Sequence, residues 1–305
     1  MYNFLFHRVH PERDLLWDPM NPELFEKCIK KIKSKYEVVL FEEYMNAGDF
    51  SNSKSVATIM FDDGYLDNFE YALPILEKHN VKASFYVVTN CIVNNQPTWT
   101  HALEYIFQHS LKSRIAFPFD FIPSQWKDNV FSGFDEKIAF IKKFKPFLKT
   151  ISHQNREKVL KHLKQYWNDV ELPKLMLNWE QVRAISQKGP YIGSHTVNHL
   201  MLGTIEEETL IFEELKNSGS TIEKELGFFP CTISYPVGSY NQMVIEQSKK
   251  AGYMFGLAVG QDEQESLDTN FFEIKRIELY NEPWWKTKLR ISNSLEKIKK
   301  IIRYR

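Results

Sequence analysis

Short apolar runs alternate with amphipathic stretches along this chain, and that alternation constrains the fold more than any other feature. The apolar runs have the length of buried strands, and the stretches between them have the length of helices. Strands separated by such helices form parallel βαβ units, so the sequence predicts an α/β fold. The predicted strands are residues 3–7, 38–41, 56–61, 81–88, 191–193, 232–235, 253–259 and 274–279. The main predicted helices are residues 22–35, 66–79, 206–226 and 242–251.

The number of units and the missing glycine motifs favour a barrel over a nucleotide-binding sheet. The sequence contains neither GxGxxG nor GKS/T, so it lacks the glycines that cradle phosphates in nucleotide-binding folds. Roughly seven or eight strand–helix units are the number that a (β/α) barrel needs. A doubly wound sheet is the alternative at this point.

The alternation lapses between residues 94 and 178, which are polar, aromatic and rich in lysine. Helical patterns at residues 101–109, 136–147 and 156–167 predict a mostly helical insertion within a barrel of residues 1–285. Because it joins two core strands, it should emerge at one end of the barrel, as a lid, a substrate wall or a passive stabilising element. The lone His101, His109, His153 and His162 within it have no partner pattern and are interpreted as surface residues.

The last twenty residues, 286–305, are predicted to form a basic amphipathic helix, since eight Lys and Arg face one acid, Glu296. Such a helix either contacts an anionic membrane surface or packs on its own domain.

Charge and cysteine content narrow the classes of partner and compartment. Lys plus Arg and Asp plus Glu both number 39, so no net field attracts nucleic acid. Three cysteines without a CxxC pair argue against a disulfide framework or a thiolate metal site. The opening MYNFLFHRVH lacks the features of a secretory signal, and no apolar span has membrane length. These features predict a cytoplasmic protein that does not bind nucleic acid.

The strongest motif is TIMFDDGYLDN, in which an apolar strand ends in Asp62 and Asp63 before a glycine. The carboxyl ends of barrel strands face the active site. Neighbouring acids there can divide their work, one holding a metal ion and the other acting as a base. The alternative is a plain Asp-Gly turn.

A second motif, YIGSHTVNHL, places His195 and His199 four residues apart after another strand. On one turn of helix this spacing directs both imidazoles at one point, as a divalent metal requires, although surface histidines share the spacing by chance. Together with an aspartate from the first motif, the two histidines complete a three-ligand catalytic site with positions open for water.

Three weaker candidates complete the set. The run TISYPVGSYN leads from Tyr235 into a Pro-x-Gly turn around Val237, which either exposes backbone N–H groups to an oxyanion or is a structural turn. His7 ends the first predicted strand, where a surface or packing role is the usual one. Trp99 borders the insertion and is a candidate for stacking on a sugar ring or for core packing.

Taken in order, these motifs resemble the polysaccharide deacetylases of the NodB-homology class, also called carbohydrate esterase family 4. MFDDG resembles that family's TFDDG motif, SHTVNH its HTxxH-type motif, and SYPVGSYN its later P-x-G turn. The opening strand and FLFHRVH further resemble the circularly permuted subgroup that includes poly-N-acetylglucosamine deacetylases. The resemblance covers about residues 3–279 and implies a distorted (β/α)7 barrel. It also implies one divalent metal ion, with zinc the first choice and cobalt, nickel or manganese as others.

The resemblance also implies roles for single residues. Asp62 would be the general base, His7 the acid that protonates the departing amine, and the Val237 amide an oxyanion donor. The metal ligands would be Asp63, His195 and His199.

The chain departs from the family pattern just before the proline turn. Unpermuted members carry an arginine there to orient the base, whereas this chain has Ser234. Arg276 is a candidate replacement, with a structural ion pair as the alternative. Val237 replaces a common aromatic residue of the turn.

The implied function is a metal-dependent hydrolase that removes an N-acetyl group from an amino sugar of a glycan, glycolipid or activated precursor. The implied partner is therefore an N-acetylated carbohydrate. Two alternatives remain open: a C–N hydrolase of a non-sugar amide or cyclic imide, and a catalytically silent glycan-binding protein.

Overall fold

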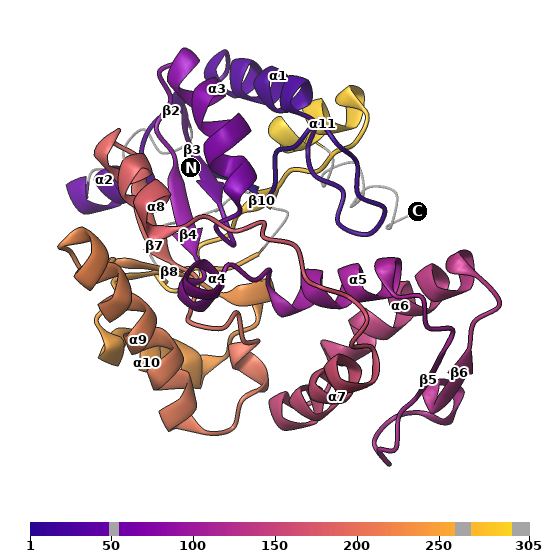
Figure 1. Cartoon of the computed structure of the whole chain (residues 1–305). Coiled ribbons are helices and arrows are strands. Elements are labelled where there is room, and N and C mark those ends of the chain that lie inside the picture. Colours follow the sequence, from indigo (N-terminus) through magenta and orange to yellow (C-terminus); the bar gives the residue numbers. More distant parts are fainter. Residues whose placement is uncertain (49–54, 260–269, 295–305) are drawn as a thin grey trace, which may run out of the picture.

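A parallel sheet forms the centre of the protein. The computed structural model describes residues 1–48, 55–259 and 270–294. The sheet runs in the order β10-β1-β3-β4-β7-β8-β9, and each neighbouring pair is parallel (Figure 1). Its strands are β1 (Tyr2–Phe6), β3 (Val56–Phe61), β4 (Ser84–Val87), β7 (Tyr191–Ser194), β8 (Thr232–Ser234), β9 (Phe255–Leu257) and β10 (Ile277–Glu278), with β2 (Glu37–Val38) paired to β3 at one side.

The segment before β10 joins the two ends of this sheet. The N–H of Gly256 in β9 donates to Phe271 O, the N–H of Ile274 donates to Gly256 O, and the N–H of Ala258 donates to Ile274 O. The same segment then continues into β10, which pairs with β1. The seven strands therefore close into a distorted barrel, which confirms the predicted architecture and rules out the doubly wound sheet.

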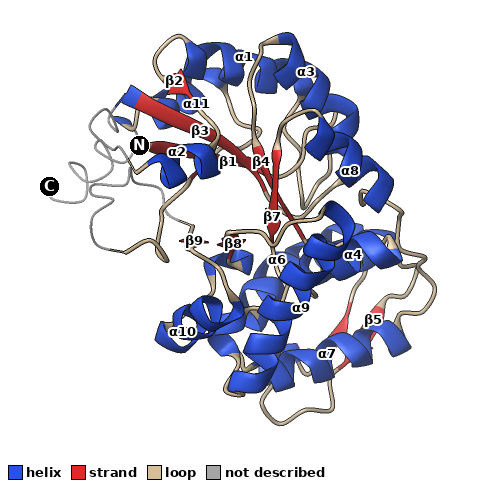
Figure 2. Ribbon diagram, turned by 90° about the vertical axis from the view of Figure 1, so that its left-hand side faces the viewer, coloured by secondary structure: helices blue, strands red, loops and turns tan. Residues whose placement is uncertain are grey.

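Helices cover the outside of the barrel (Figure 2). The first of them, α1 (Pro22–Lys33), shows why they form where they do: Asn21 caps its N-terminus, Pro22 occupies its first turn, and Phe25 and Ile29 are buried against the sheet. The other outer elements are α2 (Phe41–Ala47), a π-helical turn η2 (Asn68–Ala72), α3 (Leu73–Lys78), α4 (Thr89–Asn94), α8 (Trp179–Gln187), α9 (Glu208–Leu226), α10 (Gln242–Ala251) and α11 (Trp284–Ile291).

Alternate side chains of each strand fill the barrel interior. Leu5, Met60 and Tyr86 belong to one buried cluster inside the barrel, whereas neighbours such as Phe61 pack beneath the outer helices. The Tyr86 ring leaves no room for a side chain at Gly193, where a Cβ would lie 2.3 Å from the ring. The same alternation continues past the strand ends and turns polar side chains toward a common centre.

The predicted insertion forms a unit with its own core beside the barrel (Figure 1). Its helices are α5 (Trp99–His109), α6 (Phe134–Leu148) and α7 (His153–Tyr166). They coincide with the three predicted helical patches, except that the third was predicted one residue too long, to Trp167. Phe107, Phe144 and Trp167 are among the aromatic side chains that fill this core. The sequence did not predict the antiparallel pair of β5 (Arg114–Ala116) and β6 (Asp128–Val130).

Other boundaries differ from the prediction in places. The predicted strand at 38–41 is wrong beyond Val38, because Leu40 is the N-cap of α2. His101 is only 1% exposed and bonds to the Tyr65 hydroxyl, so it is not a surface residue. No helix among the described residues is long and apolar enough to cross a membrane. The predicted basic C-terminal helix lies outside the described residues from position 295 onward.

Candidate active site

Three buried side chains converge at the carboxyl ends of β3 and β7. Oδ1 of Asp63 lies 3.4 Å from Nε2 of His195 and 3.3 Å from Nε2 of His199. The three ligand atoms lie within 4.8 Å of one another. Asp63 Oδ1 is buried and accepts no hydrogen bond from the described residues, so its lone pairs face the two imidazoles. One carboxylate and two imidazoles fit a divalent metal such as zinc, with positions left for water or substrate.

Asp63 reaches this position because the chain reverses directly after β3. Asp63 and Gly64 both have a positive φ, 74° and 82°, and a Cβ on Gly64 would lie 3.2 Å from Cγ1 of Val87. The predicted Asp-Gly turn therefore exists, and it places the carboxylate at the site. Burial would raise the pKa of the Asp63 carboxyl, but His195 and His199 hold that pKa well below its usual range.

The loop after β7 differs from the prediction. The two histidines do not share a helical turn, because residues 195–200 form a loop with φ values of 68° at Thr196 and 57° at His199. The His199 N–H donates to the Thr196 hydroxyl at 3.1 Å, so a side-chain contact replaces a helical backbone bond. Strained backbone of this kind concentrates at functional sites.

Neighbouring groups fix the orientation of both histidines. Nδ1 of His195 lies 2.8 Å from the Ser234 carbonyl, and donation to that oxygen leaves Nε2 free to bind a metal. The His199 carbonyl accepts a hydrogen bond of 3.1 Å from the indole nitrogen of Trp99. Trp99, at the start of the insertion, therefore supports the loop that carries His195 and His199.

The second aspartate, Asp62, has a different environment. Nη1 of Arg276 lies 2.7 Å from its Oδ1, and the Ser234 hydroxyl donates to its Oδ2 at 3.0 Å. Nη2 of Arg276 also donates to the Ser234 hydroxyl, at 2.9 Å, and the Arg276 side chain is fully buried. Burial alone would raise the pKa of the Asp62 carboxyl, but the Arg276 charge lowers it below its ordinary value. Arg276 therefore pairs with Asp62, whereas the family pattern places the arginine that pairs with this aspartate just before the proline turn.

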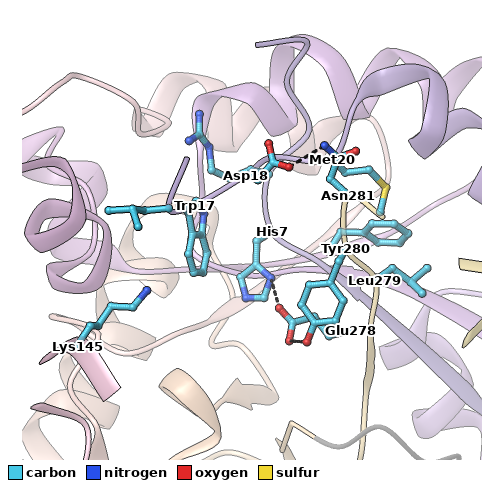
Figure 3. Close-up of a pocket in the computed structure, with 12 residues that line it drawn as sticks. His7, Trp17, Asp18, Met20, Lys145, Glu278, Leu279, Tyr280 and Asn281 are labelled. Carbon is cyan, nitrogen blue, oxygen red and sulfur yellow. Dashed lines mark hydrogen bonds and ion pairs between the residues drawn. The ribbon is translucent and has the colours of Figure 1, made fainter. Parts of the chain in front are cut away.

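His7 lies at the end of β1 beside a cavity of about 300 Å³ (Figure 3). Its Nδ1 lies 3.4 Å from Oε1 of Glu278, and its ring meets the Trp17 ring edge to face at 5.5 Å. The Tyr280 hydroxyl donates to the other Glu278 oxygen at 2.6 Å. Lys145 of the insertion lines the same cavity, so β1, β10, the loop after β1 and the insertion all contribute to it.

The structure brings most of the predicted site residues together, with one correction. The Tyr235 side chain is 0% exposed and stacks on Tyr240 beneath the outer helices. Its side chain therefore does not contact a substrate. Val237 has a φ of 58°, a strained value for a β-branched residue.

Sequence reasoning missed Glu278, Trp17 and Lys145. Glu278 follows Arg276 by two residues, so the period of a strand places both side chains on one face and could have indicated it. Trp17 and Lys145 are far apart in the sequence and carry no local signal.

A comparison with protein families agrees with this geometry. The family model described as "Polysaccharide deacetylase" matches residues 50–256, which is more than half of the chain. The chain belongs to the polysaccharide deacetylase family. Among curated proteins, YxkH of Bacillus subtilis (strain 168), whose name places it with the polysaccharide deacetylases, is 21% identical over 229 residues. The match covers 75% of this chain and 53% of YxkH, so the chain spans about half the length of that relative.

Solved structures of this fold extend beyond the matched residues. The deacetylase PplD of Streptococcus pyogenes, solved with acetate, is 18% identical with a TM-score of 0.61, and the likeness covers 97% of each chain. IcaB from Ammonifex degensii is 14% identical with a TM-score of 0.59, covering 95% of this chain and 96% of IcaB. At this identity the likeness shows the fold, which includes β1 and β10 on either side of the family match.

Proposed function

We propose that the protein is a metal-dependent hydrolase that removes an N-acetyl group from an amino sugar of a glycan, glycolipid or activated sugar precursor. One observation carries the proposal: Asp62 is held by a buried arginine directly beside the Asp63, His195 and His199 set. A carboxylate held next to a metal-binding set is the arrangement that amide hydrolysis by water needs. Membership of the polysaccharide deacetylase family supports the same reaction.

Each group of the site has a role in this reaction. A divalent ion, for which we propose zinc, would be held by Asp63, His195 and His199, and when bound it supplies an activated water and polarises the acetamide carbonyl. Asp62 takes a proton from the attacking water, while Arg276 and Ser234 keep its carboxylate in place.

The remaining steps concern the carbonyl oxygen and the leaving nitrogen. The N–H of Val237 would donate to the developing oxyanion, a role that its strained backbone supports. His7 would donate a proton to the departing amine while Glu278 faces its Nδ1. Acetate and a free amino sugar are the products.

The cavity beside His7 supports a sugar over a small cyclic imide. Tyr280 lines it, and the aromatic face of such a side chain suits the apolar face of a pyranose ring. Its volume of about 300 Å³ lies at the lower end of the range for ligand pockets. The acetate bound to PplD matches the expected product, which further supports the proposal.

Metal analysis and acetate release together test the proposed function. We expect about one divalent ion per chain in the intact protein, and acetate release from N-acetylated glycans. His199→Ala should lose the ion, whereas Asp62→Asn should keep it and release no acetate. His109→Ala, at an exposed histidine of α5, is the matched control and should behave as the intact protein.

Two outcomes would contradict the proposal. An intact protein that binds the ion but releases acetate from no glycan would favour a non-sugar amide or imide substrate. One that binds no ion would favour a glycan-binding role. The cytoplasmic location and the membrane contact of residues 286–305 stay predictions, which cell fractionation and vesicle binding can test.

A further inference from the structure

The loop after β1 ties the insertion to His7. Leu16 of this loop packs against the aromatic core of the insertion. Asp14 accepts backbone hydrogen bonds of 2.8 Å from Leu16 and Trp17, and its Oδ1 also lies 3.3 Å from Nε2 of Gln108 in α5. The backbone of Trp17 is therefore held by a turn that the insertion itself anchors.

The Trp17 ring lies between the insertion and the His7 ring (Figure 3). Nζ of Lys145 lies 5.6 Å from the centre of the Trp17 ring, a favourable position for a cation. His7 meets the Trp17 ring at 5.5 Å with an interplanar angle of 85°. Lys145 is in turn paired with Glu104 of α5, which is 4% exposed. Helices α5 and α6 of the insertion therefore hold the Lys145 ammonium group in place, and that group in turn holds the Trp17 ring.

Glu278 holds the other side of the same imidazole. With Nδ1 facing Glu278 and one side of the ring against Trp17, the His7 side chain is constrained from two directions. A lost neighbour on either side would leave the ring free to rotate about its side-chain bonds. Proton donation to a leaving group requires a donor within hydrogen-bond reach, so this freedom would lower the rate of that step.

We propose that the insertion is a positioning device for the general acid: Lys145, through Trp17, keeps His7 oriented to protonate the leaving amine. Trp17 and Lys145 are positioning residues in this scheme and do not touch the reacting atoms. The inference rests on the proposed function, because it needs His7 to act as the acid. It assigns the insertion an active part, in place of the lid, wall or passive roles that the sequence left open.

The chemistry of the leaving group provides a specific test. When the C–N bond of an acetamide breaks, the nitrogen must receive a proton from His7, because an unprotonated amide anion is too basic to leave. The attacking water forms the new C–O bond and gives its proton to Asp62. When 4-nitrophenyl acetate is the substrate, the nitrophenolate leaves without a proton. A defect confined to the acid therefore slows the amide reaction and spares the ester reaction.

The experiment compares kcat and KM for an N-acetylated amino sugar and for 4-nitrophenyl acetate. For Trp17→Leu we expect the amide kcat to fall about tenfold or more. General acid catalysis contributes about 10²–10⁴-fold to a reaction rate, so this loss corresponds to a part of that contribution. The ester kcat should stay within about twofold, since it needs no acid. Lys145→Met should show the same split with a smaller loss, and His7→Ala the largest. Lys142→Met, at an exposed lysine of α6, is the matched control.

The outcomes distinguish a failure of the positioning role from a failure of the proposed function. Retained ester activity and metal content would also show that each variant is folded. Equal losses on amide and ester, or a raised KM with an unchanged amide kcat, would overturn the positioning role and leave the proposed function standing; the second result would make Trp17 a sugar contact. If the intact protein cleaves the ester but no acetamide, the proposed function fails and the inference fails with it.

Discussion

Removing the charge of Arg276 tests how the site keeps Asp62 ionised. Arg276 is 0% exposed and Asp62 is 2% exposed, so Arg276→Met leaves a carboxylate buried without its counter-charge. Breaking a buried pair in this way costs about 3–5 kcal/mol of the free energy of unfolding. The carbonyl of Ala258 also loses the hydrogen bond that it accepts from Nε of Arg276. Replacing both partners removes the unpaired charge, so Arg276→Met with Asp62→Asn should recover about 2 kcal/mol or more.

Urea unfolding of the metal-free protein at pH 7 measures these differences. With a urea slope of about 3 kcal/mol per molar, a loss of about 3 kcal/mol lowers the unfolding midpoint by about 1 M. Arg183→Met is the matched control, because Arg183 pairs with Glu225 at the surface with its side chain 43% exposed. That change should cost less than about 1 kcal/mol.

The double variant decides the interpretation. A loss below about 1 kcal/mol for Arg276→Met, or a double variant no more stable than the single one, would refute the view that Arg276 compensates a buried charge. Because Asp63, His195 and His199 are untouched, we expect Arg276→Met to keep the binding of a divalent ion that the proposed function requires, while its kcat for deacetylation falls.

Three further predictions concern other parts of the barrel. Burial raises the pKa of the Glu42 carboxyl from 4.5 to about 7, so the folded state keeps a proton that the unfolded chain releases, and stability falls as pH rises through that range. The stability of Glu42→Gln relative to the intact protein should therefore increase by up to about 3 kcal/mol from pH 4.5 to pH 8. Melting curves that show the same stability difference at every pH would contradict this. Gly193→Ala should cost about 1–3 kcal/mol because its Cβ collides with Tyr86, whereas Gly133→Ala, with no atom within 4 Å, should change the urea midpoint little. Val237→Gly should stabilise the fold by about 1 kcal/mol by relieving its positive φ and should lower kcat; unchanged stability would argue against strain at this turn.

The parts of the fold that local pattern determines were predictable from the sequence. Strand β3 was predicted to the residue because a run of six residues, apolar except for Thr58, ends at a charged pair. Helix α10 was also predicted to the residue, since Asn241 caps its start and Gly252 ends it in the left-handed conformation. Asp62, Asp63, His195 and His199 meet as predicted, because parallel strands bring their carboxyl ends to one face of a barrel.

The remaining features depend on contacts between distant segments. The histidine loop is not helical because the Thr196 side chain bonds the backbone, and spacing alone does not distinguish the two. His101 is buried because Tyr65, in the loop after β3, provides a hydrogen-bond partner 36 positions away in the sequence. The same applies to Tyr235, whose exposure depends on how α9 and α10 pack against β8.

The segment that closes the barrel contacts both groups to which we assign a proton transfer, Asp62 and His7. Arg276, the residue before β10, pairs with Asp62, and Glu278, two residues later, faces His7. Side chains two residues apart on a strand share a face and lie about 6–7 Å apart along it, so one segment places the partners of Asp62 and of His7 at a fixed separation. A one-residue shift in this segment would turn both side chains to the outer face. Under the proposed function, deleting Lys275 should therefore abolish deacetylation by displacing the partners of Asp62 and His7 together, while Asp63, His195 and His199, in the loops after β3 and β7, stay in place. Retained binding of the divalent ion together with lost activity on amide and ester substrates is the expected result. A variant that loses only amide hydrolysis would show that the two partners are set independently.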